Sequence, residues 1–210
     1  MNTKRILLFA AFFMFAGLSF AKPFQEGVHY VPIEPMPPVG EGDRVEVLEF
    51  FMYLCPHCKA FEPAVNAWKK RQPENVDFQQ VPAMFGGAAN MHAKAFYALE
   101  TMGERDRLHD AFFAAIHDEK KDLKTREALE TWLQSQGVDV EKFRAAMGSF
   151  AVAAKANRAQ TLMRRYGIRS VPATVVDGRY RSGSGFRNYE EITEVLDHVV
   201  DKVLQERKTK

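Results

Sequence analysis

The hydrophobic pattern divides the chain into strand-like segments towards both ends and a helical block between them. Residues 45–53 are almost continuously apolar, which is typical of a strand that is buried on both faces of a sheet. Residues 76–81 alternate apolar and polar positions and predict the next strand. From about residue 88 to residue 166 the apolar positions recur at helical spacing, which predicts a series of helices. The pattern therefore indicates a sheet interrupted by a helical insertion.

Strand character returns after the helical block. Residues 173–176 form a short apolar strand, Asp177-Gly178 is a hairpin turn signal, and residues 179–181 begin the partner strand. Asn188 is placed to cap a final amphipathic helix. A short edge strand is also expected near residues 28–31. We therefore predict an α/β fold with a central mixed β-sheet flanked by helices and an inserted all-helical domain.

The first 21 residues have the pattern of a secretory signal peptide. Lys4 and Arg5 precede an uncharged apolar run over residues 6–20, and residues 19–21 are a small-x-small sequence that favours cleavage after Ala21. The run of about 15 residues is shorter than the roughly 20 that a membrane-spanning helix needs. An uncleaved membrane anchor is the alternative, and we expect cleavage and export.

These patterns predict four sections along the chain. A signal peptide covers residues 1–21, the first part of the sheet domain residues 22–86, the helical insertion residues 87–160, and the second part of the sheet domain residues 161–210. Removal of the signal peptide, which contains two basic residues and no acid, takes the formal net charge from +2 to 0. A neutral chain without a basic stripe has no electrostatic reason to bind nucleic acid or anionic lipid.

Cys55 and Cys58 are the only cysteines of the chain, and they stand where the predicted strand turns into a helix over residues 58–71. Exported proteins that depend on disulfides for stability usually contain several of them, and a disulfide that closes so small a loop adds little stability. The alternatives are a structural disulfide or a metal site. Zinc uses three or four protein ligands, and only the two cysteines and His57 are available locally. We therefore predict a redox-active dithiol that uses no metal and no cofactor.

The position of Cys55 at a helix start predicts its chemistry. Free backbone N–H groups and the positive end of the helix dipole favour a thiolate there, so the pKa of Cys55 should be low. His57 adds a donor or a positive charge, and Pro56 pre-sets the turn into the helix. A stabilised reduced form makes the disulfide a better oxidant. Cys58, one turn along, is expected to resolve the mixed disulfide formed at Cys55.

The segment Ser170-Val171-Pro172-Ala173 is the second candidate element. Proline cannot donate a hydrogen bond inside a sheet, so Pro172 marks either the start of a strand or a cis turn. Together with the upstream dithiol, it predicts a cis-proline loop that faces the cysteines, with the Val171 backbone free to pair with an extended peptide. An ordinary trans strand boundary is the alternative.

Glu49 is the third candidate, because it lies within a nearly continuous apolar strand. Burial raises the pKa of a carboxyl group, which would suit a proton acceptor near Cys58. The alternative is a carboxylate that faces a polar edge or forms a structural pair. The other histidines show no ligand spacing and are interpreted as surface or structural residues: His29, His92, His109, His117 and His198.

Taken together, these motifs resemble the DsbA family, the exported thiol:disulfide oxidoreductases with a thioredoxin fold. The resemblance extends over nearly all of the chain after the signal peptide, including the helical insertion. The Pro-His pair between the cysteines is more specific than Cys-x-x-Cys alone. The matching segments are residues 47–51, residues 55–58 with Phe61-Glu62, residues 85–87 and residues 171–173.

The resemblance implies a periplasmic dithiol oxidase. Such an enzyme passes its Cys55–Cys58 disulfide to unfolded exported polypeptides and is reoxidised by a DsbB-like, quinone-linked membrane protein. We expect a monomer. The roles carried over are Cys55 as nucleophile, Cys58 as resolver, His57 as thiolate stabiliser and Glu49 as buried acid, with Val171, Pro172 and the adjoining Ser170 forming the substrate loop.

One position departs from the family pattern. Some members carry a lysine near the buried acid, on the strand that here covers residues 76–81, and this segment contains none. Two other functions stay open at this point. One is a disulfide isomerase or reductase of the same fold, and the other is a peptide-binding module in which the cysteines are incidental.

Overall fold

The structure is a computed structural model that describes residues 24–38, 40 and 42–209. The predicted signal peptide, residues 1–21, lies outside this part. Within the described residues, no helix combines the length and the apolar character needed to cross a membrane.

The described strands form one mixed sheet in the order β1-β5-β4-β2-β3. The pair β2–β3 is parallel and the remaining pairs are antiparallel, as predicted for a mixed sheet. The strands are β1 (Tyr30–Pro32), β2 (Val45–Phe51), β3 (Val76–Pro82), β4 (Ala173–Val176) and β5 (Tyr180–Ser182). Because β2 lies between β3 and β4 and both of its faces are covered, its sequence is apolar almost throughout.

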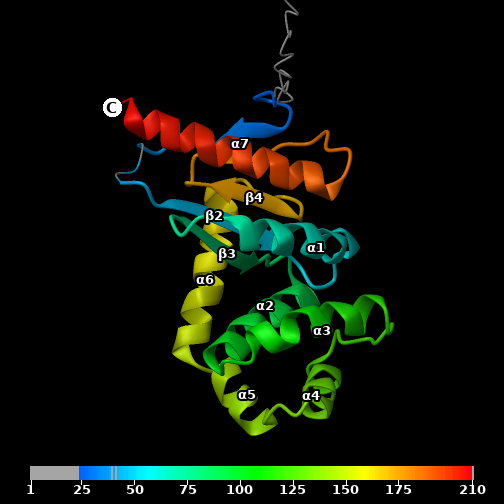
Figure 1. Cartoon of the computed structure of the whole chain (residues 1–210). Helices are drawn as coiled ribbons and strands as arrows, with labels where there is room; N and C mark the ends of the chain where they lie inside the picture. Colours follow the sequence, from blue (N-terminus) through cyan, green and yellow to red (C-terminus); the bar gives the residue numbers. More distant parts are fainter. Residues whose placement is uncertain (1–23, 39, 41, 210) are drawn as a thin grey trace, which may run out of the picture.

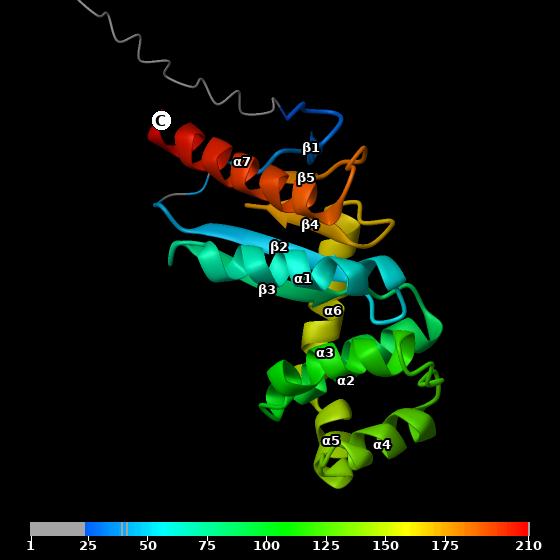
Figure 2. The ribbon, with the colours of Figure 1, turned by 45° about the vertical axis from the view of Figure 1, so that its right-hand side comes forward.

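Helices cover both faces of the sheet. Successive side chains of a strand point to opposite faces, so Val45 and Val47 pack with α1 and α7, whereas Leu48 and Phe50 pack with α2 and α6. Figures 1 and 2 show α2 to α5 gathered at the end of the molecule away from α7, with α6 running back to the sheet. The helices are α1 (Pro56–Arg71), α2 (Gly87–Thr101), α3 (Arg105–His117), α4 (Arg126–Ser135), α5 (Val140–Met147), α6 (Phe150–Arg165) and α7 (Tyr189–Lys208).

Local sequence signals explain several of the element ends. Asp177 and Gly178 have φ values of 55° and 64°, so the predicted hairpin turn lies in the left-handed region that this dipeptide favours. The Asn188 side chain accepts a hydrogen bond from the Glu191 N–H at 2.8 Å and caps α7 as predicted.

Two predicted boundaries shift by a few residues. The first helix begins at Pro56 and not at residue 58, because proline is well suited to the first helical position. The edge strand predicted near residues 28–31 lies at Tyr30–Pro32. The helices α2 to α5 lie within the predicted insertion, residues 87–160, whereas α6 extends beyond it to Arg165, and the domain boundaries themselves stay a prediction.

Candidate active site

Cys55 lies at the end of the turn that connects β2 to α1, directly before the first residue of the helix. Its N–H donates to the Met52 carbonyl at 2.9 Å, which closes the turn, and the residue itself is the N-cap of α1. In that position the Cys55 sulfur accepts the Cys58 N–H at 3.4 Å. Pro56 occupies the start of the helix, where its missing N–H breaks no helical hydrogen bond. The turn therefore directs free backbone donors at the sulfur of a residue that is 8% exposed.

The surroundings of Cys55 favour the thiolate. A hydrogen bond from the Cys58 thiol lowers the pKa of Cys55 most, and the backbone N–H groups of Cys58 and His57 act in the same direction. Burial opposes these contacts, and the net effect takes the pKa from 9.0 to about 6. At pH 7 the reduced protein therefore carries mainly a Cys55 thiolate.

Cys58 has the opposite surroundings. It lies inside the first turn of α1 and is 0% exposed. The hydrogen bond that its thiol gives to Cys55 raises the pKa of Cys58 strongly, and burial and the nearby Cys55 charge add to this effect. Both cysteines are free thiols in this structure. One sulfur of the pair thus carries the charge and the other keeps its proton.

The Val171–Pro172 peptide bond is cis, as predicted for a loop facing the cysteines. The Cys55 thiol lies 3.4 Å from the Val171 carbonyl oxygen, so the loop contacts the sulfur directly. Among the described residues, the Val171 N–H has no backbone partner. Ser170 is exposed on the same loop. The loop therefore offers a free backbone donor beside the more exposed sulfur.

A cavity of about 430 Å³ opens beside this loop. Its walls come from α1, from the cis-proline loop and β4, from the end of β5 and the segment that follows it, and from the start of α7. They include Phe61, Pro172, Phe186 and Ile192, so much of the lining is apolar. His57 is exposed at this cavity, and its Nδ1 lies 2.9 Å from the Tyr189 hydroxyl at the start of α7.

Glu49 is buried, as predicted, with 0% exposure. Its Oε2 accepts a hydrogen bond from the Gln80 amide at 3.0 Å, and its Oε1 has no partner among the described residues. Burial raises the pKa of Glu49 most, the Glu62 charge raises it further, and the value reaches about 8. Gln80 stands on β3 directly opposite Glu49 and supplies the polar contact on the strand that lacks a lysine.

Further polar residues, which the sequence did not indicate, surround this carboxyl group. The Gln80 amide also lies 3.3 Å from Glu62 Oε1, and Glu62 Oε1 lies 3.2 Å from His109 Nε2. His109 comes from α3, and its Nδ1 lies 2.8 Å from the Tyr53 hydroxyl. The helical insertion therefore contributes a residue to a buried polar network beneath the dithiol. Neither its spacing nor its neighbours in the sequence marked His109.

The donor atoms of Glu62, His109 and Asp110 lie within 4.8 Å of one another, which is a spacing that could hold a metal ion. Glu62 and His109 are both buried and hydrogen bonded inside the network, whereas Asp110 is exposed. The contacts of Glu62 and His109 are thus accounted for by hydrogen bonding, and we assign both residues to the network.

Comparisons with known proteins agree with this geometry. Residues 46–197 match the family model described as a DSBA-like thioredoxin domain. The thiol:disulfide interchange protein DsbA of Pseudomonas aeruginosa is 38% identical over 190 residues, which cover 90% of either chain. The DsbA of Azotobacter vinelandii is 41% identical over 177 residues, covering 84% of this chain and 83% of its own.

Solved structures show the same relationship. The crystal structure of Pseudomonas aeruginosa DsbA superposes with a TM-score of 0.80 at 37% identity and covers 88% of this chain and 97% of its own. The predicted α/β fold with a helical insertion is therefore confirmed as a thioredoxin fold. The match includes the strand-to-helix turn with both cysteines and the cis-proline loop. This chain belongs to the DsbA family and is a thiol:disulfide oxidoreductase.

Proposed function

We propose that this protein is a periplasmic dithiol oxidase that donates its Cys55–Cys58 disulfide to newly exported, unfolded polypeptides. The observation that carries the proposal is the Cys55 sulfur at the N-cap of α1, where it accepts the Cys58 N–H and has a pKa of about 6. A sulfur that is stable as a thiolate stabilises the reduced enzyme. The disulfide is then easily reduced, and the protein acts as an oxidant of other thiols.

The disulfide is transferred in two successive thiol–disulfide exchange reactions. A substrate thiolate attacks the Cys55 sulfur of the oxidised enzyme, forms a mixed disulfide and breaks the Cys55–Cys58 bond. Cys58 leaves with the electron pair and takes up a proton. A second substrate thiolate then attacks the substrate sulfur of the mixed disulfide, and Cys55 leaves as a thiolate. The substrate has lost two electrons to the enzyme dithiol, and the low pKa of Cys55 makes it a good leaving group.

The first step requires a proton at Cys58, because the pKa of its buried thiol is strongly raised. Glu49 is suited to supply it. Its carboxyl group is fully buried with a pKa of about 8, so at neutral pH most molecules hold a proton there. The Glu49 charge is also among the groups that raise the pKa of Cys58. We therefore assign Glu49 the role of proton donor to Cys58 in the forward reaction and acceptor in the reverse.

The cavity beside the cis-proline loop is suited to bind substrate. An unfolded polypeptide can pair its backbone with the free Val171 N–H while an apolar side chain enters the space beside Phe61 and Pro172. Hydrogen bonds to the substrate backbone do not depend on the substrate's amino-acid sequence, and a shallow apolar surface accepts many different side chains. The site therefore favours broad recognition of unfolded chains over recognition of one folded partner.

Export and reoxidation complete the proposed cycle. The pattern over residues 1–21 supports cleavage and export, and an oxidising compartment is where such a dithiol can act as an oxidase. The reduced enzyme must pass two electrons onwards, and a DsbB-like, quinone-linked membrane protein is the partner that the family resemblance implies. We propose that the protein works as a monomer.

Equilibration of the purified protein with reduced and oxidised glutathione tests the direction of this chemistry. An oxidase is expected to be reduced under conditions in which a thioredoxin, at about −270 mV, remains oxidised. A couple as reducing as that of thioredoxin contradicts the proposal. Refolding of a scrambled-disulfide protein separates the isomerase alternative, because an oxidase adds disulfides to reduced chains but reshuffles wrong ones poorly.

A further inference from the structure

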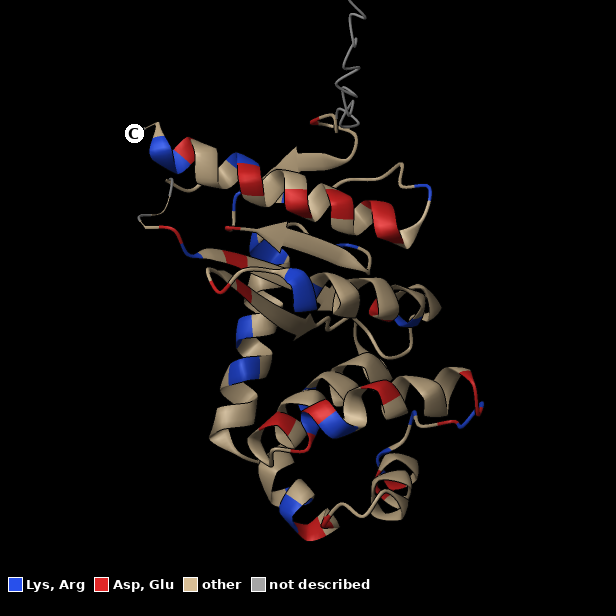
Figure 3. Cartoon of the chain, viewed as in Figure 1, with Lys and Arg blue, Asp and Glu red and all other residues tan. Residues whose placement is uncertain are grey.

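A second cavity lies beside β3, the strand at one edge of the sheet. It has a volume of about 240 Å³, and its walls come from α1, β3, α2, α3 and α6. Four basic side chains line it: Lys69, Arg105, Lys155 and Arg158. Among the described residues that line it, Glu100 is the single acid. Figure 3 shows basic residues of α6 beside the strands, close to the C-terminal end of α1.

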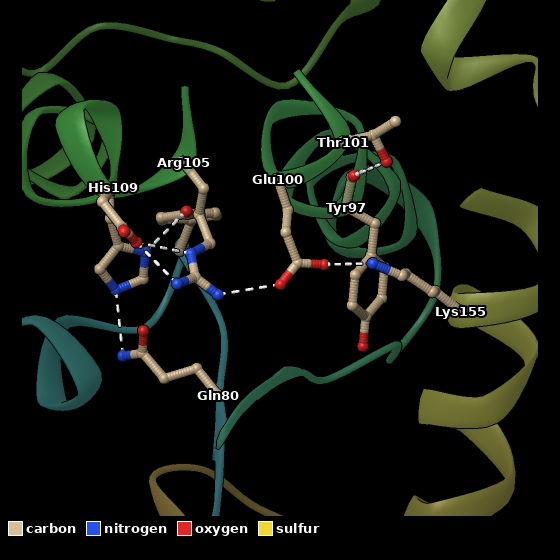
Figure 4. Close-up of polar contacts among 9 residues, drawn as sticks. Gln80, Tyr97, Glu100, Thr101, Arg105, His109 and Lys155 are labelled. Carbon is tan, nitrogen blue, oxygen red and sulfur yellow. Dashed lines mark hydrogen bonds and ion pairs between the residues drawn. The ribbon is translucent and has the colours of Figure 1, made fainter. Parts of the chain in front are cut away.

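Aromatic rings and one carboxylate hold these cations in place. The Lys69 ammonium lies 5.6 Å from the centre of the Phe78 ring, and the Lys155 ammonium lies 6.0 Å from that of Tyr97. Glu100 accepts from Arg105 at 2.9 Å with one oxygen and from Lys155 at 2.6 Å with the other. Figure 4 shows Glu100 between these two side chains. A single carboxylate thus pairs with two of the four cations.

The other two cations of the cavity, Lys69 and Arg158, are less closely paired with carboxylates than Arg105 and Lys155 are. Lys69 forms no ion pair within 4.0 Å among the described residues, and the closest carboxylate oxygen to Arg158 is that of Glu46 at 3.8 Å. The lining alone carries a net charge of +3, from four cations and one carboxylate. Glu46 and the exposed Asp106, which pairs with Arg105 at 2.7 Å, lie around the cavity, as does Asp77, which accepts a hydrogen bond from the lining residue Gln79. These three carboxylates lie outside the lining itself, where the cations are in excess.

The helix α6 adds to the excess of positive charge on this side of the molecule. Its sequence contains Lys155, Arg158, Arg164 and Arg165 and no acidic residue at all. The chain after the signal peptide is neutral overall, so the charge on this side is a local segregation that composition does not reveal. The four cations of the cavity come from three separate helices, which explains why the sequence contains no basic stripe.

We propose that this cavity binds a small multivalent oxyanion of the phosphate class. Positive side chains held close together repel one another, and an anion between them relieves that repulsion. The guanidinium of Arg158 and the ammonium of Lys69 are suited to phosphate oxygens. The volume of 240 Å³ is below the roughly 300–1,000 Å³ of sites for drug-sized ligands, which favours a compact anion over a peptide.

The site is distinct from the dithiol, and the charge of its Lys69 lowers the raised pKa of Glu49 only as a minor contribution. Gln80 is the one residue that it shares with the network beneath the dithiol, since its side chain lines the cavity and its amide donates to Glu49. No basic residue of the cavity touches either cysteine. Absence of anion binding would therefore leave the oxidase proposal intact, and absence of oxidase activity would leave the anion site intact.

Isothermal titration of the oxidised protein with inorganic phosphate tests the proposal, with sodium chloride at equal ionic strength as the comparison. We expect one saturable site with a dissociation constant at or below about 1 mM. Lys69→Gln and Arg158→Gln should each weaken binding by roughly fivefold or more, because each removes one charge from the anion's surroundings. Glu100→Gln should strengthen binding, because it removes the one acid of the lining. Lys142→Gln on α5 is the matched control and should change nothing.

Several outcomes would overturn the site. They are the absence of saturable heat with phosphate, an equal response to chloride, and equal losses in Lys69→Gln and Lys142→Gln. Weaker binding by Glu100→Gln, in a protein whose urea unfolding midpoint is unchanged, would also contradict it. Binding to phosphatidylglycerol vesicles that inorganic phosphate does not displace would place the cations on a membrane-facing surface instead.

Discussion

The two sulfurs of the dithiol lie three positions apart and have opposite surroundings. Cys55 stands at the open end of α1, is partly reachable by solvent and has a pKa of about 6. Cys58 lies inside the first turn, is fully buried and has a strongly raised pKa. The same short motif therefore contains one sulfur that is stable as an anion and one that requires a proton. This difference gives the exchange its direction.

The hydrogen bond between the two thiols contributes most to the contrast, and backbone geometry adds to it. A helix leaves its first N–H groups without partners, and only the residue at the cap can receive them. Cys55 holds that position, and its sulfur accepts the Cys58 N–H at 3.4 Å. Cys58 is already inside the helix and faces the Glu49 side of the sheet, where the charge of the buried acid raises its pKa further.

Serine substitutions separate the two sulfurs and should have the largest effect. Cys55→Ser removes the attacked sulfur and is expected to reduce oxidation of a peptide dithiol to the uncatalysed rate. Cys58→Ser keeps the reactive thiolate and removes its resolver, so mixed disulfides with substrate should accumulate. Non-reducing electrophoresis of reactions with a reduced substrate protein measures both. Mixed disulfides of similar yield in the two variants would contradict the assigned roles.

Replacement of the buried acid Glu49 tests the surroundings of Cys58, the buried sulfur of the pair. The folded-state pKa of Glu49 is raised from 4.5 to about 8, so the carboxyl group costs stability increasingly as pH rises from 4.5 towards 8. Glu49→Gln should therefore stabilise the reduced protein at pH 7 by an amount on the order of 3 kcal/mol, and by almost nothing near pH 4. Urea unfolding at both pH values measures this.

The exposed Glu74→Gln is the matched control and should leave stability unchanged at both pH values. Oxidation of substrate by Glu49→Gln should be slower, because the amide cannot give a proton to Cys58. A variant that is destabilised at pH 7 would show that Glu49 is held as a charged structural partner. That result would remove the proton-donor assignment.

The pH dependence of the redox equilibrium tests the thiolate state of Cys55, the more exposed sulfur of the pair. Above pH 6 the reduced enzyme holds one proton, at Cys58, and below pH 6 it holds two. The potential should therefore fall by about 30 mV per pH unit above pH 6 and by about 59 mV per pH unit below it. The Cys55 thiolate stabilises the reduced fold, and this contribution is lost as the pH falls through about 6. A single slope of about 59 mV per pH unit from pH 4 to pH 8 would contradict the assignment.

The contact between His57 and Tyr189 should have the smallest effect. The His57 charge is the last of the causes that lower the pKa of Cys55. Tyr189→Phe removes a hydrogen bond of 2.9 Å that is exposed to solvent, which contributes about 0.5–1.5 kcal/mol at most. We expect a change in the glutathione equilibrium of less than roughly tenfold, with the folded state unaffected. A larger change would mean that Tyr189 controls the ring orientation of His57.

Local pattern was sufficient to predict much of this molecule. Apolar continuity marked β2, helical periodicity marked the insertion, and Asn188 and Asp177-Gly178 marked an element start and a turn. The two cysteines at the strand-to-helix turn predicted the chemistry of the site, because a helix start acts on the nearest sulfur in the chain. These features depend on neighbours in the sequence, and periodicity and capping describe such neighbours well.

The polar network beneath the dithiol could not be predicted in this way. Gln80 is 31 residues from Glu49, and His109 is 47 residues from Glu62. Their meeting depends on how β3 and α3 pack against the centre of the molecule, which no local pattern describes. The lack of a lysine on β3 indicated only that Glu49 has no lysine partner on that strand, and nothing in the sequence pointed to the Gln80 amide in its place.

Titration of the reduced protein by the ultraviolet absorbance of the thiolate, with the oxidised protein as the baseline, tests the central claim most directly. Only two cysteines are present, and Cys58 keeps its proton over the range of interest, so one transition belongs to Cys55. The account predicts a midpoint at about pH 6. A midpoint near the ordinary value of 9.0 would contradict it, because neither the Cys58 thiol nor the backbone N–H groups of the helix start would then lower the pKa of Cys55.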